Sequence, residues 1–236
     1  MRSGLQTTAF RAALPALSLL FYAGPSSAAS ITVETEIYEW TESVPEQELA
    51  AAPTMLPQQV DSGRKLLASY GPFHVVGHDR VELAGSIESS SVGQFRAMLS
   101  AWPGIMQIDM VDCPGTGDDA AIFAIARLVR RAGIATHVPD GGFVASGAVE
   151  LFLSGAKRSA APTAEFAVHS WRDSDGMEAD DYAADDPVNM EYIRFYTEMG
   201  LPQDKANAFY ALTNSVGHDD ALYLGRSDIA AYIPLD

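Results

Sequence analysis

From about residue 73 onward, short apolar runs alternate with segments that have the apolar spacing of helices, and this alternation constrains the fold more than any other feature. Strands separated by helices tend to pair in parallel, with the helices packed on the sheet. We therefore expect an α/β fold with a mainly parallel, twisted sheet and surrounding helices. The expected strands are 73–76, 80–87, 105–111, 133–138 and 165–169, and the expected helices are 91–101, 118–132, 145–154, 188–199, 203–212 and 228–232.

The first 29 residues have the pattern of a secretory signal peptide. Arg2 and Arg11 precede an apolar run at 12–22, and small residues follow it up to Ala29. This run is shorter than the ~20 residues of a membrane-spanning helix, so an uncleaved anchor is the weaker interpretation. We expect cleavage after Ala28 or Ala29 and a periplasmic or secreted mature protein that does not insert into a membrane.

The rest of the chain divides into an N-terminal segment and one domain. Alternating apolar and polar residues at 31–37 predict a half-buried strand. The stretch 41–59 contains prolines and no sustained period, which is typical of a linker or a surface arm. We assign residues 30–72 to this segment and residues 73–236 to a single domain, because the mature chain is long enough for one sizeable core.

The sequence is strongly acidic, with 31 acidic and 15 basic residues and a net charge of −16. Such a surface repels phosphate backbones and anionic lipids, which argues against nucleic acid as a partner. The single cysteine, Cys113, cannot form an intramolecular disulfide, and its neighbour Asp112 disfavours a reactive thiolate. The stability of the mature protein must then come from its apolar core.

Three segments, in chain order, carry the groups that an acyl-transfer site needs. Residues 112–117 form a glycine-rich turn after a strand, Ser146 begins an apolar helix, and His169 ends a strand. A serine at a helix N-terminus has its own amide and the following one directed outward, where the helix dipole favours a developing oxyanion. Gly147 lets a substrate carbonyl approach that backbone, and the turn can supply a second amide. The candidates for the second amide are Gly115, Thr116 and Gly117.

This ordered set resembles the Clp protease family, a part of the Clp-protease/crotonase superfamily, over about residues 81–232. It is most similar to the family's secreted bacterial members, whose role is uncertain. In that family the serine between small residues at a helix start is the nucleophile, and a histidine some two dozen residues later is the base. Ser146 and His169, which are 23 residues apart, match these positions.

The resemblance also implies the remaining site residues. The family's acid lies about fifty residues beyond the histidine, which corresponds here to Asp219, with Asp220 as the second choice. The backbone amides of Thr116 and Gly147 would hold the oxyanion. The implied function is an exported, ATP-independent serine hydrolase, a peptidase by first choice, that acts on a peptide or protein substrate and needs no cofactor.

One departure from the family pattern leaves a different function open. The family usually has Ser-Pro-Gly-Gly in the turn, whereas this chain has Cys-Pro-Gly-Thr at 113–116, and threonine cannot adopt every conformation open to glycine. The alternative is a catalytically inactive Clp-like protein that binds or scaffolds a partner in the cell envelope.

Two further chemistries are weaker. A crotonase-type thioester enzyme would use the same pair of amides, but acyl-CoA is cytosolic, which conflicts with export. A serine-lysine dyad would need Lys157, at the far end of the same predicted helix as Ser146, or Lys205, which lies in a different sequence setting from the lysine of such enzymes.

Two predictions concern metals and assembly. His218 stands next to Asp219 and Asp220, but this trio has no second cluster to complete a metal site, so we expect no metal. The predicted helix at 188–199 bears apolar residues on more than one face. Because a monomer would have to bury both faces or expose one, we expect a homo-oligomer.

Overall fold

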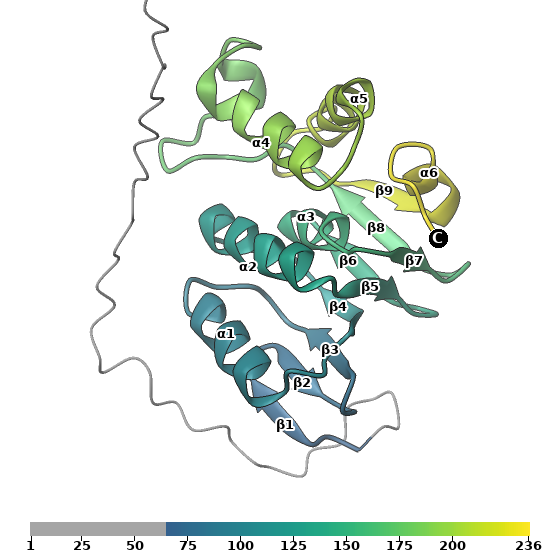
Figure 1. The fold of residues 1–236 in the computed structure, drawn as a ribbon. Coiled ribbons are helices and arrows are strands. Elements are labelled where there is room, and N and C mark those ends of the chain that lie inside the picture. Colours follow the sequence, from purple (N-terminus) through teal and green to yellow (C-terminus); the bar gives the residue numbers. More distant parts are fainter. Residues whose placement is uncertain (1–64) are drawn as a thin grey trace, which may run out of the picture. The chain divides into compact units, whose positions relative to one another are not determined.

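The computed structural model describes residues 65–236, and Figure 1 shows them as one sheet with helices packed along it. The expected signal peptide, the expected strand at 31–37 and the expected linker at 41–59 lie outside the described residues. Within residues 65–236, no helix has the length and apolarity that crossing a membrane requires.

The elements follow the order that the sequence predicts, and each expected helix agrees with the observed one to within two residues at either end. The strands are β1 (Ala68–Tyr70), β2 (Phe73–Val75), β3 (Arg80–Ala84), β4 (Gln107–Cys113), β5 (Ala135–Val138), β6 (Phe143–Ala145), β7 (Arg158–Ala160), β8 (Glu165–Val168) and β9 (Leu222–Gly225). The helices are α1 (Ser91–Ala101), α2 (Asp119–Ala132), α3 (Gly147–Leu153), α4 (Pro187–Glu198), α5 (Gln203–Thr213) and α6 (Arg226–Ala230), with a short 3₁₀ turn at Ala179–Asp181.

The sheet is mixed rather than mainly parallel, which corrects the expectation from the sequence. Its strand order is β1-β2-β3-β4-β6-β8-β9, with β5 paired to β4 and β7 paired to β5. The interior strands from β3 to β8 pair in parallel, whereas β1, β2 and β9 join antiparallel. Only Gly71 and Pro72 connect β1 to β2, and so short a connection joins antiparallel strands.

The sheet also begins earlier than residue 73, where the sequence analysis places the start of the domain. In the β1–β2 pair, Ala68 lies opposite Val75 and Tyr70 lies opposite Phe73. The side chains of all four residues are buried. A three-residue strand is too short to show a period of two, which is why β1, and likewise β6 and β7, had no clear sequence signal.

Helix α2 shows how local sequence determines an element that lies beside the site. Asp118 accepts a hydrogen bond from the amide of Ala121 (3.0 Å) and so caps the helix. Gly133, with a φ of +69°, ends it in the left-handed conformation that glycine adopts without strain. The buried face includes Ile122 and Ile125, whose spacing of three residues places them on one side of the helix.

Helix α4 buries its apolar residues inside the same chain. Phe195 stacks on Phe123 of α2 with ring centroids 4.3 Å apart, and Tyr196 packs edge-on against Phe209 of α5 at 5.3 Å. Both faces that suggested self-association are therefore covered by α2 and α5. A homo-oligomer stays a prediction, but it no longer has this apolar helix as its reason.

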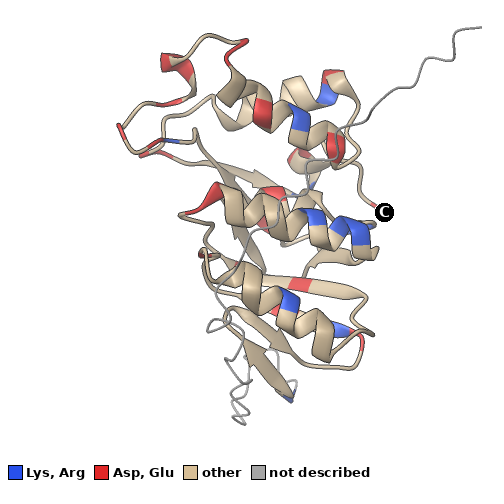
Figure 2. Ribbon diagram, turned by 60° about the vertical axis from the view of Figure 1, so that its left-hand side comes forward, with Lys and Arg blue, Asp and Glu red and all other residues tan. Residues whose placement is uncertain are grey.

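Charged residues are unevenly distributed along the described part of the chain (Figure 2). Acidic residues gather in the loop 173–186 before α4 and at the first turn of α2, whereas Arg130 and Arg131 lie in the last turn of α2. The first turn of α2 borders the end of the sheet at which β4, β6 and β8 finish. The acidic end of the molecule is therefore also the end that carries the candidate site.

Candidate active site

Ser146 joins β6 to α3 in a single sharp turn. It has a φ of +52° and a ψ of −137°, and it is the one non-glycine residue with positive φ among residues 65–236. Such a backbone conformation costs about 1–3 kcal/mol and persists where the surrounding structure enforces it. A strained strand-to-helix turn is also how α/β hydrolytic enzymes present a serine nucleophile.

A backbone hydrogen bond holds this turn in place. The amide of Ser146 donates to the carbonyl of Ala167 in β8 at 2.9 Å. The expectation that the serine's own amide points outward is therefore wrong, because the neighbouring parallel strand uses that donor. The amide of Gly147, at the first position of α3, has no carbonyl to bond within the helix and is left as the donor nearest to Ser146.

The glycine-rich turn lies directly against Ser146. A Cβ atom added to Gly115 would stand 2.8 Å from the Cβ and 3.3 Å from the Oγ of Ser146, so only glycine permits this approach. Gly115 also has a φ of +123°, a conformation that side chains rarely adopt. Because the unusual backbone falls on Gly115, threonine is tolerated at position 116, where the family pattern has a second glycine.

Thr116 and Gly147, the expected oxyanion residues, are brought into contact. A Cβ added to Gly147 would stand 2.3 Å from the Cγ2 of Thr116. The hydroxyl of Thr116 donates to the carbonyl of Ile87 (2.8 Å) and accepts from the amide of Asp118 (2.9 Å), which fixes the side chain. The side chain of Thr116, the residue that departs from the family pattern, is therefore fixed in contact with the start of α3.

His169 follows the last residue of β8, beside β6, the strand that ends immediately before Ser146. In the parallel β6–β8 pair, Ala145 lies opposite Ala167, so Ser146 and His169 extend from neighbouring strand ends. Neighbouring strands lie about 4.8 Å apart, and both residues line the same cavity. The structure thus brings together the two residues that the sequence motifs selected, each at the junction expected for it.

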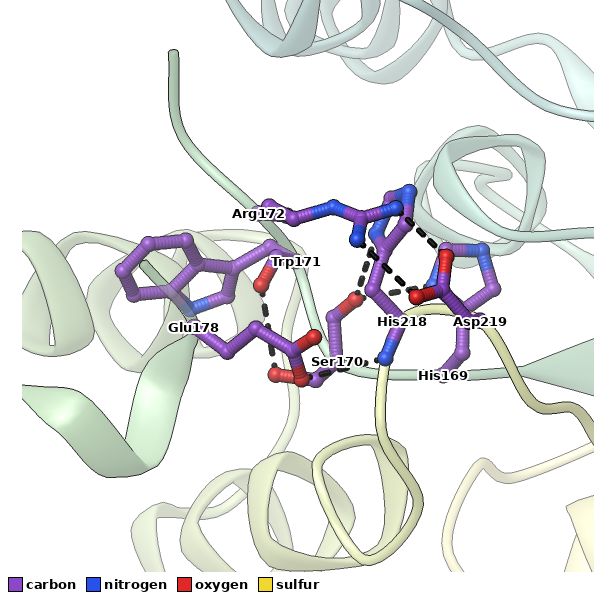
Figure 3. A network of polar contacts seen from close by, with 7 residues as sticks. All are labelled: His169, Ser170, Trp171, Arg172, Glu178, His218 and Asp219. Atoms are coloured by element: carbon purple, nitrogen blue, oxygen red, sulfur yellow. Dashed lines mark hydrogen bonds and ion pairs between the residues drawn. The ribbon is translucent and has the colours of Figure 1, made fainter. Parts of the chain in front are cut away.

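A backbone carbonyl orients His169 (Figure 3). The Nδ1 of His169 lies 2.8 Å from the carbonyl oxygen of Ser170, and the Nδ1 of His218 lies 3.0 Å from the same oxygen. A carbonyl only accepts, so Nδ1 of His169 must carry the hydrogen and Nε2 is left free to take a proton. The two rings meet edge-on, with centroids 4.7 Å apart. The tautomer that a triad acid would impose is set here by the main chain.

Asp219 is held by Arg172 instead of by His169. Its two carboxylate oxygens accept from the guanidinium of Arg172 at 2.7 and 3.1 Å, and its side chain is 81% exposed. The hydrogen bond from Arg172 lowers the pKa of Asp219 below its usual value. Neither Asp219 nor Asp220 lines the cavity, whereas Arg172 does.

His218 lines the cavity, a role that its sequence position beside two aspartates did not predict. Its amide donates to Glu178 (3.0 Å), and the amide of Ser170 donates to Val216 (3.0 Å), so the loop before Asp219 is fastened to the chain that follows β8. The acid position that the family resemblance implies, Asp219, lies in this same loop, since His218 immediately precedes it. Which residue of that loop faces His169 depends on the loop's path.

The cavity beside Ser146 has a volume of about 310 Å³. Its lining residues are Thr116, Gly117, Asp119, Ser146, Gly147, Glu150, Val168, His169, Trp171, Arg172, Tyr192, Tyr196, Thr213, Asn214 and His218. Glu150 is the buried acid among them: its Oε1 accepts from the hydroxyl of Tyr196 at 2.7 Å, and burial raises its pKa to about 7. At the edge, the hydroxyl of Tyr192 donates to Asp119 at 2.6 Å.

Other chemistries find little support in residues 65–236. No group of three or more His, Cys, Asp or Glu side chains is arranged there to hold a metal ion. Cys113 is buried, its thiol donates to the carbonyl of Leu83 (3.4 Å), and burial raises its pKa far above the usual range. Cys113 is therefore a buried packing residue in the turn at 112–117 and not a nucleophile.

Comparison with known proteins gives no sequence match, either to a family model or to a curated protein. Solved structures do match. A ClpP1 mutant from Listeria monocytogenes is 18% identical with a TM-score of 0.47, and the match covers 66% of this chain and 87% of that chain. A mutant of a membrane-bound stomatin-specific protease is 17% identical with a TM-score of 0.45, covering 65% and 76%. Another mutant of that protease, in complex with a substrate peptide, is 18% identical with a TM-score of 0.44, covering 65% and 72%.

The likeness is one of fold. A ClpP1 protein and a stomatin-specific protease are thus among the solved structures to which this chain is similar, with TM-scores below 0.5. The chemistry of the site rests on this chain's own residues.

Proposed function

We propose that this protein is an exported serine hydrolase that cleaves peptides or proteins without ATP. The observation that carries the proposal is the backbone of Ser146, held at a φ of +52° on a strand-to-helix turn against Gly115. Strain of this kind at a cavity wall is characteristic of functional residues. His169, oriented by a main-chain carbonyl on the wall of the same cavity, supplies the base.

In the proposed reaction, the Oγ of Ser146 attacks the carbonyl carbon of the scissile amide while its proton passes to Nε2 of His169. The amides of Gly147 and Thr116 donate to the oxygen on which negative charge develops. The C–N bond then breaks, and His169 returns the proton to the leaving amine. Water attacks the acyl-serine in the same manner, releases the acid and regenerates the free hydroxyl of Ser146.

The carbonyl of Ser170 takes the part of the triad acid in this proposal. It accepts the Nδ1 hydrogen of His169 and stabilises the imidazolium through its dipole, without a full negative charge. Asp219 pairs with Arg172, which lines the cavity, and makes no hydrogen bond to His169 among the described residues. We therefore propose a serine-histidine dyad with a main-chain partner, in place of the Ser146-His169-Asp219 triad that the family resemblance implies.

A fluorophosphonate probe tests the nucleophile, the base and the oxyanion donors together. We expect the purified protein to be labelled at Ser146, as read by peptide mass spectrometry. Ser146→Ala should abolish labelling, and His169→Ala should slow it by at least about 10³-fold. Ser215→Ala is the matched control, since Ser215 is an exposed serine that does not line the cavity.

Lack of labelling in the folded wild-type protein, together with no hydrolysis of activated esters, would refute the hydrolase. The alternative is then the inactive Clp-like protein that binds a partner in the cell envelope. The pairing of Asp219 with Arg172 favours that alternative, because it removes the expected acid from the histidine.

Export is the second part of the proposal and rests on the signal pattern at residues 1–29. Mass spectrometry of the protein recovered from the envelope fraction should find a mature N-terminus at Ala29 or Ser30. A membrane-bound protein that keeps Met1 would contradict cleavage.

A further inference from the structure

Glu150 places a carboxylate inside the molecule, one helical turn after the nucleophile. It lies on α3, four residues after Ser146, and both residues line the same cavity. Its side chain is buried, and its Oε1 accepts from the hydroxyl of Tyr196. None of the ion pairs among residues 65–236 involves Glu150. A buried carboxylate without a cation is costly to ionise, and a ligand cation would remove that cost.

A second acceptor in the same cavity lacks a donor. Asn214 lines the cavity, and its Nδ2 donates to the carbonyl of Tyr210 (2.8 Å) and to the hydroxyl of Thr213 (3.1 Å). These bonds fix the orientation of the amide, because a carbonyl cannot donate to its oxygen. The Oδ1 of Asn214 is buried and has no hydrogen-bond partner among the described residues. It is therefore an unsatisfied acceptor on a residue that lines the cavity, and leaving such a group without a donor is costly.

The walls also suit a cation. Asp119 adds a second carboxylate at the edge, and the aromatic side chains of Tyr192 and Tyr196 line the cavity, where ring faces attract positive charge. Arg172 is the permanently charged cation among the lining residues, and its guanidinium donates hydrogen bonds to both carboxylate oxygens of Asp219. The cavity therefore combines carboxylates and an unused carbonyl oxygen without a cation of its own that is free to pair with them.

We propose that this cavity binds the ammonium or guanidinium group of a lysine or arginine side chain, which makes a basic residue the preferred one on the acyl side of the bond that Ser146 cleaves. The inference rests on the proposed function and adds its substrate class. A volume of about 310 Å³ is at the small end of ligand pockets, which fits a single side chain. The cation would pair with Glu150, and a further N–H would reach Asn214.

The test uses four fluorogenic peptide amides that differ only in the residue before the cleaved bond, which is arginine, lysine, citrulline or norleucine. Citrulline and norleucine keep the shape of arginine and lysine without the charge. At pH 8 we expect kcat/KM for the basic substrates to exceed that for the neutral ones by roughly 30-fold or more. Equal turnover of the four, or a preference for norleucine, would overturn the inference and leave the hydrolase intact.

Three variants locate the effect. Glu150→Gln keeps an acceptor for the hydroxyl of Tyr196. It should lower kcat/KM for the arginine substrate by about tenfold or more and change kcat/KM for the norleucine substrate by less than about twofold. Asp119→Asn, at a more exposed position, should lower kcat/KM for the arginine substrate by about two- to threefold. This variant provides the test if Glu150→Gln fails to fold. Glu198 is an exposed residue of α4 that pairs with Arg127 outside the cavity. Glu198→Gln should therefore leave kcat/KM for both substrates unchanged.

A binding measurement separates this inference from the hydrolase. Calorimetry with agmatine and with butanol, at pH 8, needs no turnover. Saturable agmatine binding that Glu150→Gln weakens by about tenfold supports the cation site even if the fluorophosphonate probe fails to label Ser146. Absence of agmatine binding to the wild type, or binding that Glu150→Gln leaves unchanged, would overturn the cation site whatever the probe shows.

Discussion

The two halves of the proposed site are built in different ways. The nucleophile half, from the turn at Gly115 to the start of α3, consists of main chain held by strand pairing and by close contacts that only glycine permits. The other half, the loop around His218 and Asp219, is held by hydrogen bonds that His218 donates to the Ser170 carbonyl and to Glu178, and by an exposed ion pair. The residues of the first half could be found from local sequence motifs, whereas the arrangement of the second half depends on how a distant loop crosses the sheet end.

The largest effect we expect comes from the contact between Gly147 and Thr116. Gly147→Ala would place a methyl group 2.3 Å from the Cγ2 of Thr116, so either the start of α3 or the turn must move. Because both amides of the proposed oxyanion hole lie there, we expect kcat to fall by about 10²- to 10³-fold. Steady-state kinetics on the arginine substrate provides the measurement.

A second substitution sharpens this prediction. Thr116→Ser removes the Cγ2 atom but keeps the hydroxyl that bonds Ile87, so it should restore much of the activity of Gly147→Ala. Gly115→Ala should not be rescued by it, since the φ of Gly115 is +123° whatever stands at position 116. Equal rescue of both variants would show that space, rather than backbone conformation, limits the turn.

The second effect concerns the stability cost of Glu150 in the nucleophile half. Its folded-state pKa of about 7 lies above the usual value for a glutamate, so the folded state holds more protons between about pH 4.5 and 7. The free energy of unfolding should therefore fall as the pH rises through this window, by roughly 3 kcal/mol in total.

Glu150→Gln should abolish this contribution. The free energy of unfolding of the variant, relative to that of the wild type, should therefore be higher at pH 8 than at pH 5. Urea unfolding across this range measures the difference. Glu198→Gln is the control, because Glu198 is exposed and should leave the slope unchanged. The same slope in wild type and Glu150→Gln would show that Glu150 ionises as freely as an exposed glutamate.

The smallest effect belongs to the other half. Asp219→Asn removes the ion pair with Arg172 but leaves the Ser170 carbonyl on His169, so we expect kcat to fall by less than about threefold. A true triad acid would cost up to about 10⁴-fold when replaced by asparagine. A loss of that size on any substrate that Ser146→Ala abolishes would restore Asp219 as the acid. Asp220→Asn, in the same loop, should leave kcat unchanged.

By itself, the sequence determined the features that depend on neighbouring residues. The helix bounds follow from apolar spacing and from caps such as Asp118, and Ser146 and His169 were found because each stands at a recognisable junction of elements. The turn at position 115 could be predicted because the residue there is a glycine. These signals are local, because a cap, a turn or a period of 3.6 is complete within a few residues.

Only the tertiary structure decided what depends on distant partners. β9 pairs antiparallel with β8 more than fifty residues earlier, and no property of residues 222–225 alone reveals that partner. The same holds for the carbonyl of Ser170 between His169 and His218, and for Glu150, which from its sequence position could have faced solvent. Contacts between segments far apart in the chain are set by how the sheet and its loops pack, because burial and hydrogen-bond direction exist only after the chain has folded.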